Sequence, residues 1–133
     1  NARTPMQWDA SANAGFTAGT PWIDVNPNYR QINVREAQAD PDSILHFYRR
    51  LLALRQGSDA LRSGTFRLLL PEHPQLLAYE RACGEERIRV CCNFSNAPAA
   101  LPSEIQGDCL LCDGVENGRM EPYGLCCVQL LHH

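Results

Sequence analysis

Apolar residues recur at helical spacing in the middle of the chain, at Ile44, Phe47, Tyr48, Leu51 and Leu52. This periodicity predicts one amphipathic helix of about four turns. We expect Asp40 to cap the helix, Pro41 to occupy its first position and Gly57 to end it. A shorter stretch at Val34–Ala39 is also compatible with a helix.

After this helix the apolar pattern changes from helical to strand-like. Five short runs fit strands, at Thr65–Leu70, Gln75–Arg81, Arg87–Phe94, Cys109–Cys112 and Leu125–Leu131. Turn signals stand at Gly84, at Asp113-Gly114 and at Asn117-Gly118. Antiparallel strands joined by such turns predict a small β-sandwich.

The two patterns together do not describe a complete α/β domain. A single helix preceded by irregular chain has nothing except the sandwich to cover its apolar face. We therefore expect it to be the last of a repeated series of helices whose other members lie outside this sequence. Left uncovered, the same face favours self-association of the chain.

Composition narrows the classes of function. The chain has 133 residues, of which 44% are hydrophobic and 20% are charged, and its net charge is −3. These values are typical of a globular domain. The basic residues are scattered, so we expect no nucleic-acid partner. The apolar runs are too short for a membrane span, so no membrane partner is expected.

Cysteine is frequent, with seven residues at positions 83, 91, 92, 109, 112, 126 and 127. Neighbouring residues of a strand face opposite sides, so neither Cys91-Cys92 nor Cys126-Cys127 can direct both sulfurs at one metal ion. Cys109 and Cys112 have the spacing of half a zinc site, but no second pair completes it. We expect free thiols in a reducing, cytoplasmic compartment, and neither a metal nor another cofactor.

The first forty residues show no regular period, although they hold both tryptophans. Long aperiodic segments of this kind are usually functional loops. Residues 3–9 read Arg-Thr-Pro-Met-Gln-Trp-Asp, and further short motifs follow at 16–23 and 25–34. In this order they resemble a loop of the α-amylase-like glycoside hydrolases, in the branch of the oligo-1,6-glucosidases and trehalose-6-phosphate hydrolases.

The resemblance implies a fold for nearly the whole chain. Residues 1–57 would be the last loop and the last helix of a (β/α)8 catalytic barrel, and residues 58–133 a C-terminal antiparallel β-sandwich domain. The chain would then be mainly β with one long helix, and its missing partner would be the N-terminal barrel. Gly124 departs from the family pattern, which usually has Glu at the corresponding place.

The resemblance also implies a function for the intact parent. It would be a retaining α-glucosidase acting on short α-1,6-linked gluco-oligosaccharides, or alternatively a trehalose-6-phosphate hydrolase. Arg3 matches the Arg with which the family binds the terminal glucose, together with an Asp from an early barrel loop. In the alternative interpretation, Arg3 only forms a salt bridge that stabilises the loop. Without the barrel we expect its side chain to be solvated.

The chain itself lacks the usual chemistry of a glycosidase. Retaining hydrolysis needs two carboxylates flanking the scissile bond, and the acidic residues here stand in turns, loops and a helix start. We assign no catalytic residue and expect the isolated chain to be inactive. Three aromatic residues could stack on sugar rings: Trp8, Trp22 and Tyr29. More often such residues pack a loop onto its scaffold, and we favour this interpretation. A hypothesis from another class is a non-catalytic glycan-binding or structural β module.

Overall fold

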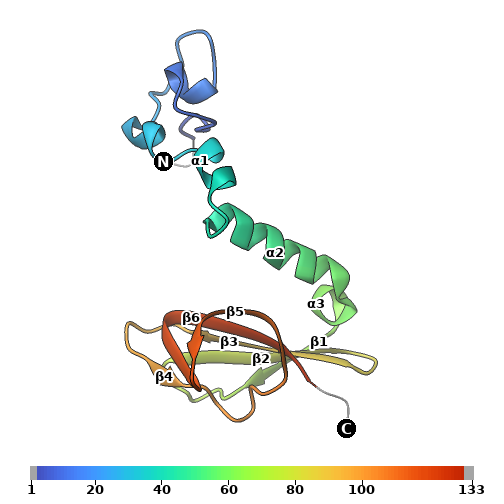
Figure 1. Cartoon of the computed structure of the whole chain (residues 1–133). Coiled ribbons are helices and arrows are strands. Elements are labelled where there is room, and N and C mark those ends of the chain that lie inside the picture. Colours follow the sequence, from blue (N-terminus) through green and yellow to red (C-terminus); the bar gives the residue numbers. More distant parts are fainter. Residues whose placement is uncertain (1–2, 131–133) are drawn as a thin grey trace. The chain divides into compact units, whose positions relative to one another are not determined.

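A computed structural model describes residues 3–130 of the chain (Figure 1). The chain divides into two compact units, Asn1–Arg50 and Leu51–His133. Among the described residues, no helix is long and apolar enough to cross a membrane.

The first unit contains short helices joined by irregular chain. Two single turns of 3-10 helix, η1 (Ala12–Gly15) and η2 (Pro27–Arg30), precede the α-helix α1 (Val34–Ala39). The buried Asn33 caps α1, because its side-chain oxygen accepts a hydrogen bond from the Glu36 N–H at 3.0 Å. The short helix expected at these residues is confirmed.

The helix α2 (Ile44–Gly57) ends at the predicted glycine but begins later than predicted. Asp40 does not cap it, because Asp40 closes α1 and its carboxylate accepts from the Asp42 N–H at 2.9 Å. The first bonds of α2 instead involve Ser43, whose carbonyl accepts from the Phe47 N–H at 3.0 Å. Pro41 therefore lies in the connecting turn and not in the helix.

The second unit holds one six-stranded antiparallel sheet and the helix α3 (Asp59–Ser63). The strands are β1 (Thr65–Leu69), β2 (Leu76–Cys83), β3 (Glu86–Asn93), β4 (Ala99–Ala100), β5 (Asp108–Glu116) and β6 (Arg119–Gln129). Strand β6 is central: it pairs with β3 and β4 along one edge and with β5 along the other. The expected long helix is thus one of three α-helices within residues 3–130, beside the two turns of 3-10 helix.

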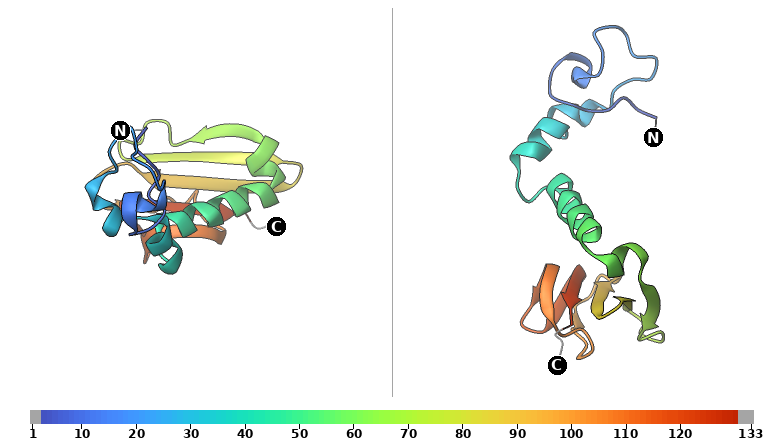
Figure 2. Two further views of the ribbon diagram at one scale, coloured as in Figure 1. Left: turned by 90° about the horizontal axis from the view of Figure 1, so that it is seen from above. Right: turned by 90° about the vertical axis from the view of Figure 1, so that its right-hand side faces the viewer.

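The five predicted strands all exist, and β4 is an addition that its two residues were too short to signal. All six strands belong to one hydrogen-bonded sheet, which curls instead of lying flat (Figure 2). The expectation of a sandwich therefore holds at the level of an antiparallel β domain and not as two separate sheets. Leu131, the last residue of the fifth predicted strand, lies outside the described residues.

The turn at Asn117-Gly118 is confirmed, since both residues have positive φ between β5 and β6. The turn predicted at Asp113-Gly114 is wrong, because these residues lie inside β5 at a bulge. There the backbone approaches β6 closely, and a Cβ on Gly124 would lie 2.6 Å from the Gly114 carbonyl oxygen. A side chain larger than hydrogen does not fit at Gly124 without a shift of the backbone.

The sheet is covered differently on its two faces. One face holds the main apolar core, with Leu76, Ala78, Cys91, Ile105, Met120, Cys126 and Val128. The other face holds a smaller cluster of Ala60, Ile88 and Cys127, against which Leu54 and Leu61 of the helices pack. The alternation along β3 explains why Cys91 and Ile88 serve opposite faces.

Candidate functional site

Backbone hydrogen bonds fold the irregular N-terminal segment onto the start of α1. The Val34 N–H donates to the Gln7 carbonyl at 2.9 Å. The Arg35 N–H donates to the Trp8 carbonyl at 3.1 Å, and the Trp8 N–H donates to the Ala14 carbonyl at 2.9 Å. The chain that follows Arg3 is therefore held at two successive residues before it turns into η1.

Amide side chains complete this scaffold. The Gln7 Nε2 donates to the Asn28 Oδ1 at 3.0 Å and also to the Ile32 carbonyl. The buried Asn33 donates through Nδ2 to the Tyr29 carbonyl at 2.9 Å while it caps α1. Gln7 bonds to groups 21 and 25 residues away, and Asn33 bonds to backbone groups nearby. These amide bonds give the loop a defined shape without regular secondary structure.

Arg3, the predicted sugar-binding residue, is exposed in this structure, and Pro5 shortly after it is buried. A largely apolar hollow of about 390 Å³ lies beside this stretch. Its lining includes Thr4, Pro5, Met6, Ile32, Val34 and Leu45. The motif thus places the Arg3 cation directly before the residues that line an apolar depression within the first unit.

Asp9 is the last residue of the motif, and its carboxylate stabilises the local fold. Its carboxylate accepts from the Ser11 N–H at 2.9 Å and from the Ser11 hydroxyl, and it pairs with Arg35 at 3.2 Å. The hydrogen bonds from Ser11 lower the pKa of Asp9 below its usual value, and the Arg35 charge adds to this effect. A Cβ on Gly15 would lie 2.9 Å from Asp9 Oδ1, so the glycine makes room for the carboxylate.

The three aromatic candidates have different surroundings. Trp8 is half exposed, and the Tyr29 ring lies 5.4 Å from the Arg30 guanidinium carbon. Trp22 exposes 86% of its surface. Trp22 therefore packs little within the described chain, and its packing against the rest of the parent stays a prediction.

Two other acidic residues are also engaged at α3. Glu86 accepts from the Ala60 N–H at 2.8 Å, at the start of α3, and Asp59 pairs with Arg62. Within residues 3–130, no three or more His, Cys, Asp or Glu side chains are arranged to hold a metal ion.

Sequence reasoning missed Glu80, which is only 4% exposed and faces three arginines. Its carboxylate lies 3.0 Å from Arg67 Nη2, 3.5 Å from Arg87 Nη1 and 2.9 Å from Arg89 Nε. Burial by itself raises the pKa of Glu80, but the hydrogen bonds and charges of Arg89 and Arg67 outweigh it, so the pKa is lowered overall. The alternating charged residues of the strands were the available signal for this cluster. They predict it only when the register that aligns the strands is known.

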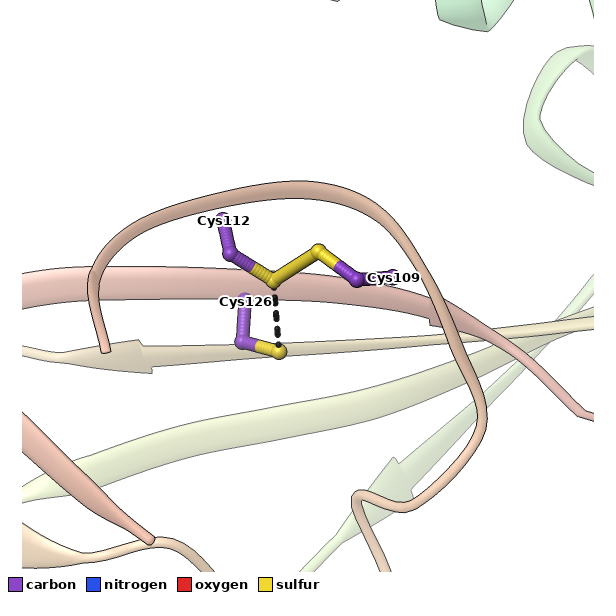
Figure 3. Close-up of a disulfide and its surroundings, with 3 residues drawn as sticks. All are labelled: Cys109, Cys112 and Cys126. Carbon is purple, nitrogen blue, oxygen red and sulfur yellow. Dashed lines mark hydrogen bonds between the residues drawn. A yellow bond between two sulfur atoms is a disulfide. The ribbon is translucent and has the colours of Figure 1, made fainter. Parts of the chain in front are cut away.

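The expectation of seven free thiols is wrong, because Cys109 and Cys112 form a disulfide (Figure 3). Residues three apart in a regular strand face opposite sides. Here the β5–β6 register shifts between Cys109 and Leu111, so one extra residue enters β5. The bulge brings both cysteines to the same face of the sheet as Cys126.

Comparison with known proteins relates this geometry to carbohydrate enzymes. Residues 1–64 match the family described as "Alpha amylase, catalytic domain". An oligo-1,6-glucosidase of Parageobacillus thermoglucosidasius is 55% identical over 95 residues, which cover 71% of this chain and 17% of the relative. A glucan 1,6-alpha-glucosidase of Streptococcus pneumoniae is 42% identical over 137 residues, covering 98% of this chain and 25% of the relative.

A trehalose-6-phosphate hydrolase of Bacillus subtilis is 37% identical over 135 residues, covering 92% of this chain and 24% of the relative. Solved structures of carbohydrate enzymes also resemble this chain. The trehalulose synthase MutB from Pseudomonas mesoacidophila matches with a TM-score of 0.87 at 36% identity, over 97% of this chain and 25% of that one. The chain therefore spans a quarter or less of the length of these curated relatives.

Proposed function

Because this chain belongs to the α-amylase family of glycoside hydrolases, we propose that it is the C-terminal portion of a retaining α-glucosidase. The substrates of the intact enzyme are short α-1,6-linked gluco-oligosaccharides. The observation that carries this proposal is the 55% identity to an oligo-1,6-glucosidase, over a match that covers 71% of the chain. The catalytic carboxylates belong to the upstream part of the parent.

The missing partner is the rest of the catalytic barrel. In this proposal residues 1–57 are its last loop and helix, and residues 58–133 are the C-terminal domain. The support is the uncovered surface of α2, where Ile44, Tyr48 and Leu52 are 77%, 58% and 52% exposed. An amphipathic helix normally buries such a face, and each large apolar side chain buried contributes about 1.5–3 kcal/mol.

The sheet also presents apolar side chains on the face that carries the smaller cluster. Phe66 and Leu68 of β1 are 62% and 46% exposed, and the Phe66 ring packs at 5.3 Å against Tyr79. A neighbouring domain of the parent would cover this surface. In the chain on its own, the uncovered residues favour self-association.

Arg3 has a functional role in this proposal. Its guanidinium, paired with an Asp of the barrel, binds the terminal glucose and closes the pocket at that end. A planar fork of donors suits both a carboxylate and neighbouring sugar hydroxyls. The exposed side chain and the scaffolded loop behind it support this role. The cytoplasmic location expected from the cysteine usage stays a prediction.

A second candidate is trehalose-6-phosphate hydrolysis. It is favoured by a relative with that name whose match covers 92% of this chain. A solved trehalose-6-phosphate hydrolase of Bacillus licheniformis also matches, with a TM-score of 0.83 at 36% identity over 99% of this chain and 26% of that one. A non-catalytic glycan-binding module is the remaining alternative, for which Trp22 would be the platform.

The test compares the full-length parent with the isolated chain. We expect the parent to hydrolyse isomaltose with retention of the α-anomer, and the isolated chain to turn over neither isomaltose nor p-nitrophenyl α-glucoside. Preference of the parent for trehalose 6-phosphate would select the second candidate. Glucoside turnover by the purified chain, reproduced in independent preparations, would contradict the proposal.

A further inference from the structure

Three cysteine sulfurs meet at one place on β5 and β6 (Figure 3). Cys109 and Cys112 form a disulfide, with their Cα atoms 6.6 Å apart. Cys126 is a free thiol, and its Sγ lies 3.2 Å from the Sγ of Cys112. An unpaired sulfur therefore contacts one end of an existing disulfide, which is the arrangement from which thiol–disulfide exchange begins.

The register of the sheet makes a second disulfide geometrically accessible. Cys112 and Cys126 are direct partners in the β5–β6 pairing. Directly opposite residues of antiparallel strands have Cα atoms about 4.5–5.5 Å apart. A disulfide spans Cα separations of about 4.4–6.8 Å. Cys112 can therefore bond to either neighbour without rearrangement of the backbone.

The cluster is also open to small reagents. A hollow of about 370 Å³ is lined by the three cysteines together with Leu101, Ile105 and Val115. Cys109 and Cys112 are exposed, whereas Cys126 is buried in the main core beneath them. A small thiol or disulfide in solution can therefore reach the exposed pair, while Cys126 is shielded.

We propose that Cys109, Cys112 and Cys126 form a thiol–disulfide exchange site on the β domain. The Cys126 thiolate bonds to the Sγ of Cys112, and the Cys109–Cys112 bond breaks. The electron pair leaves on the Cys109 sulfur, which takes up the proton that Cys126 has lost. No net oxidation or reduction occurs, so the disulfide only moves from one pair to the other.

The two states differ in what they connect. The Cys109–Cys112 disulfide closes a short loop within β5, whereas Cys112–Cys126 cross-links β5 to β6 and leaves a reactive Cys109 thiol at the surface. Burial, with the charge on Cys92 adding to it, raises the pKa of Cys126. The exchange therefore proceeds through a minor thiolate population and is slow at neutral pH.

Tryptic mapping without reduction distinguishes the two disulfides, because Arg119 separates Cys112 from Cys126. The chain is equilibrated with oxidised glutathione, treated with an alkylating reagent and digested. We expect the disulfide within the 90–119 peptide to be replaced over time by a link between peptides 90–119 and 120–133. Capture of the Cys109 thiol by the reagent should drive this replacement.

Variants at the exposed cysteines make the test independent of core packing. In Cys109→Ser the Cys109–Cys112 disulfide cannot form, so the link between peptides 90–119 and 120–133 should form without a competing bond. In Cys112→Ser this link should be lost. The control Cys127→Ser changes a residue of the opposite face and should keep the link. The proposal is overturned if Cys109→Ser gives no linked pair, if Cys112→Ser keeps it, or if Cys127→Ser loses it. Absence of any Cys109–Cys112 disulfide in the oxidised wild type overturns it as well.

Discussion

Replacement of Glu80 by Gln tests the energetics of the β domain directly. The change keeps the shape of the side chain but removes the charge that faces Arg67, Arg87 and Arg89. Glu80 is buried, whereas Arg67 and Arg87 are more than half exposed. Arg67 and Arg87 can therefore regain water when the carboxylate is lost, so neither carries the full cost of an orphaned buried charge. Arg89, whose side chain is 21% exposed, regains less water and bears more of that cost.

The expected destabilisation follows from the two close contacts. Hydrogen bonds that involve charged groups contribute about 1.5–3 kcal/mol, and the Arg67 and Arg89 bonds at 3.0 and 2.9 Å are of this kind. A unit the size of Leu51–His133 loses roughly 4–8 °C in Tm for each kcal/mol. We therefore expect Tm to fall by about 10 °C or more at neutral pH.

The pH dependence has a definite sign. The pKa of Glu80 in the folded chain lies below its ordinary value of 4.5. The ionised carboxylate therefore stabilises the fold fully above that ordinary value, and this contribution is lost as the pH falls through the lower, folded pKa. The stability difference between wild type and Glu80→Gln should shrink as the pH falls below 4.5.

Denaturant unfolding followed by circular dichroism, at neutral pH and at several pH values below 4.5, measures this difference. Glu85→Gln is the matched control, because Glu85 is an exposed carboxylate at the turn between β2 and β3. It should change the free energy of unfolding by less than about 0.5 kcal/mol. The reasoning is refuted if Glu80→Gln is as stable as this control, or if its deficit is undiminished in acid.

Three further predictions concern function and surface chemistry. In the full-length parent, Arg3→Ala should lower kcat/KM for isomaltose roughly ten- to a hundredfold while Tm is unchanged; a loss that only follows Tm would make Arg3 structural. In the isolated chain, Tyr48→Glu should reduce self-association in sedimentation experiments, and an unchanged distribution would contradict a role for the exposed α2 face. Burial, with charge on Cys126 and Cys92 adding to it, raises the pKa of Cys127 to about 11. Its thiol should therefore label far more slowly than exposed Cys83 until the chain unfolds, and equal labelling rates would oppose this.

Local sequence was sufficient for the elements whose signals are local. The spacing of apolar residues predicts α2, and the glycine signal predicts its end at Gly57. The strand-like runs predict all five longer strands, and Asn117-Gly118 predicts the hairpin turn since both residues accept positive φ. The linked motifs of the first forty residues predict the family, and the comparisons confirm it.

Features that depend on chain segments far apart in the sequence were decided only by the tertiary structure. The capping role of Asp40 is a local exception: its carboxylate accepts from the Asp42 N–H in the turn after α1, a competing local bond that the helix-start pattern does not distinguish from a cap. The turn signal at Gly114 became a bulge, because β6 runs beside it and Gly124 leaves room for the close approach.

The same limit explains the two chemical clusters that the sequence did not reveal. Glu80 meets Arg67 and Arg89 because the register aligns them across three strands, and a shift by one residue would separate them. The bulge in β5 turns Cys109 and Cys112 to one face, where β6 adds Cys126. Residue spacing alone places those two cysteines on opposite faces, so only the folded sheet, with its extra residue, could bring the three sulfurs together.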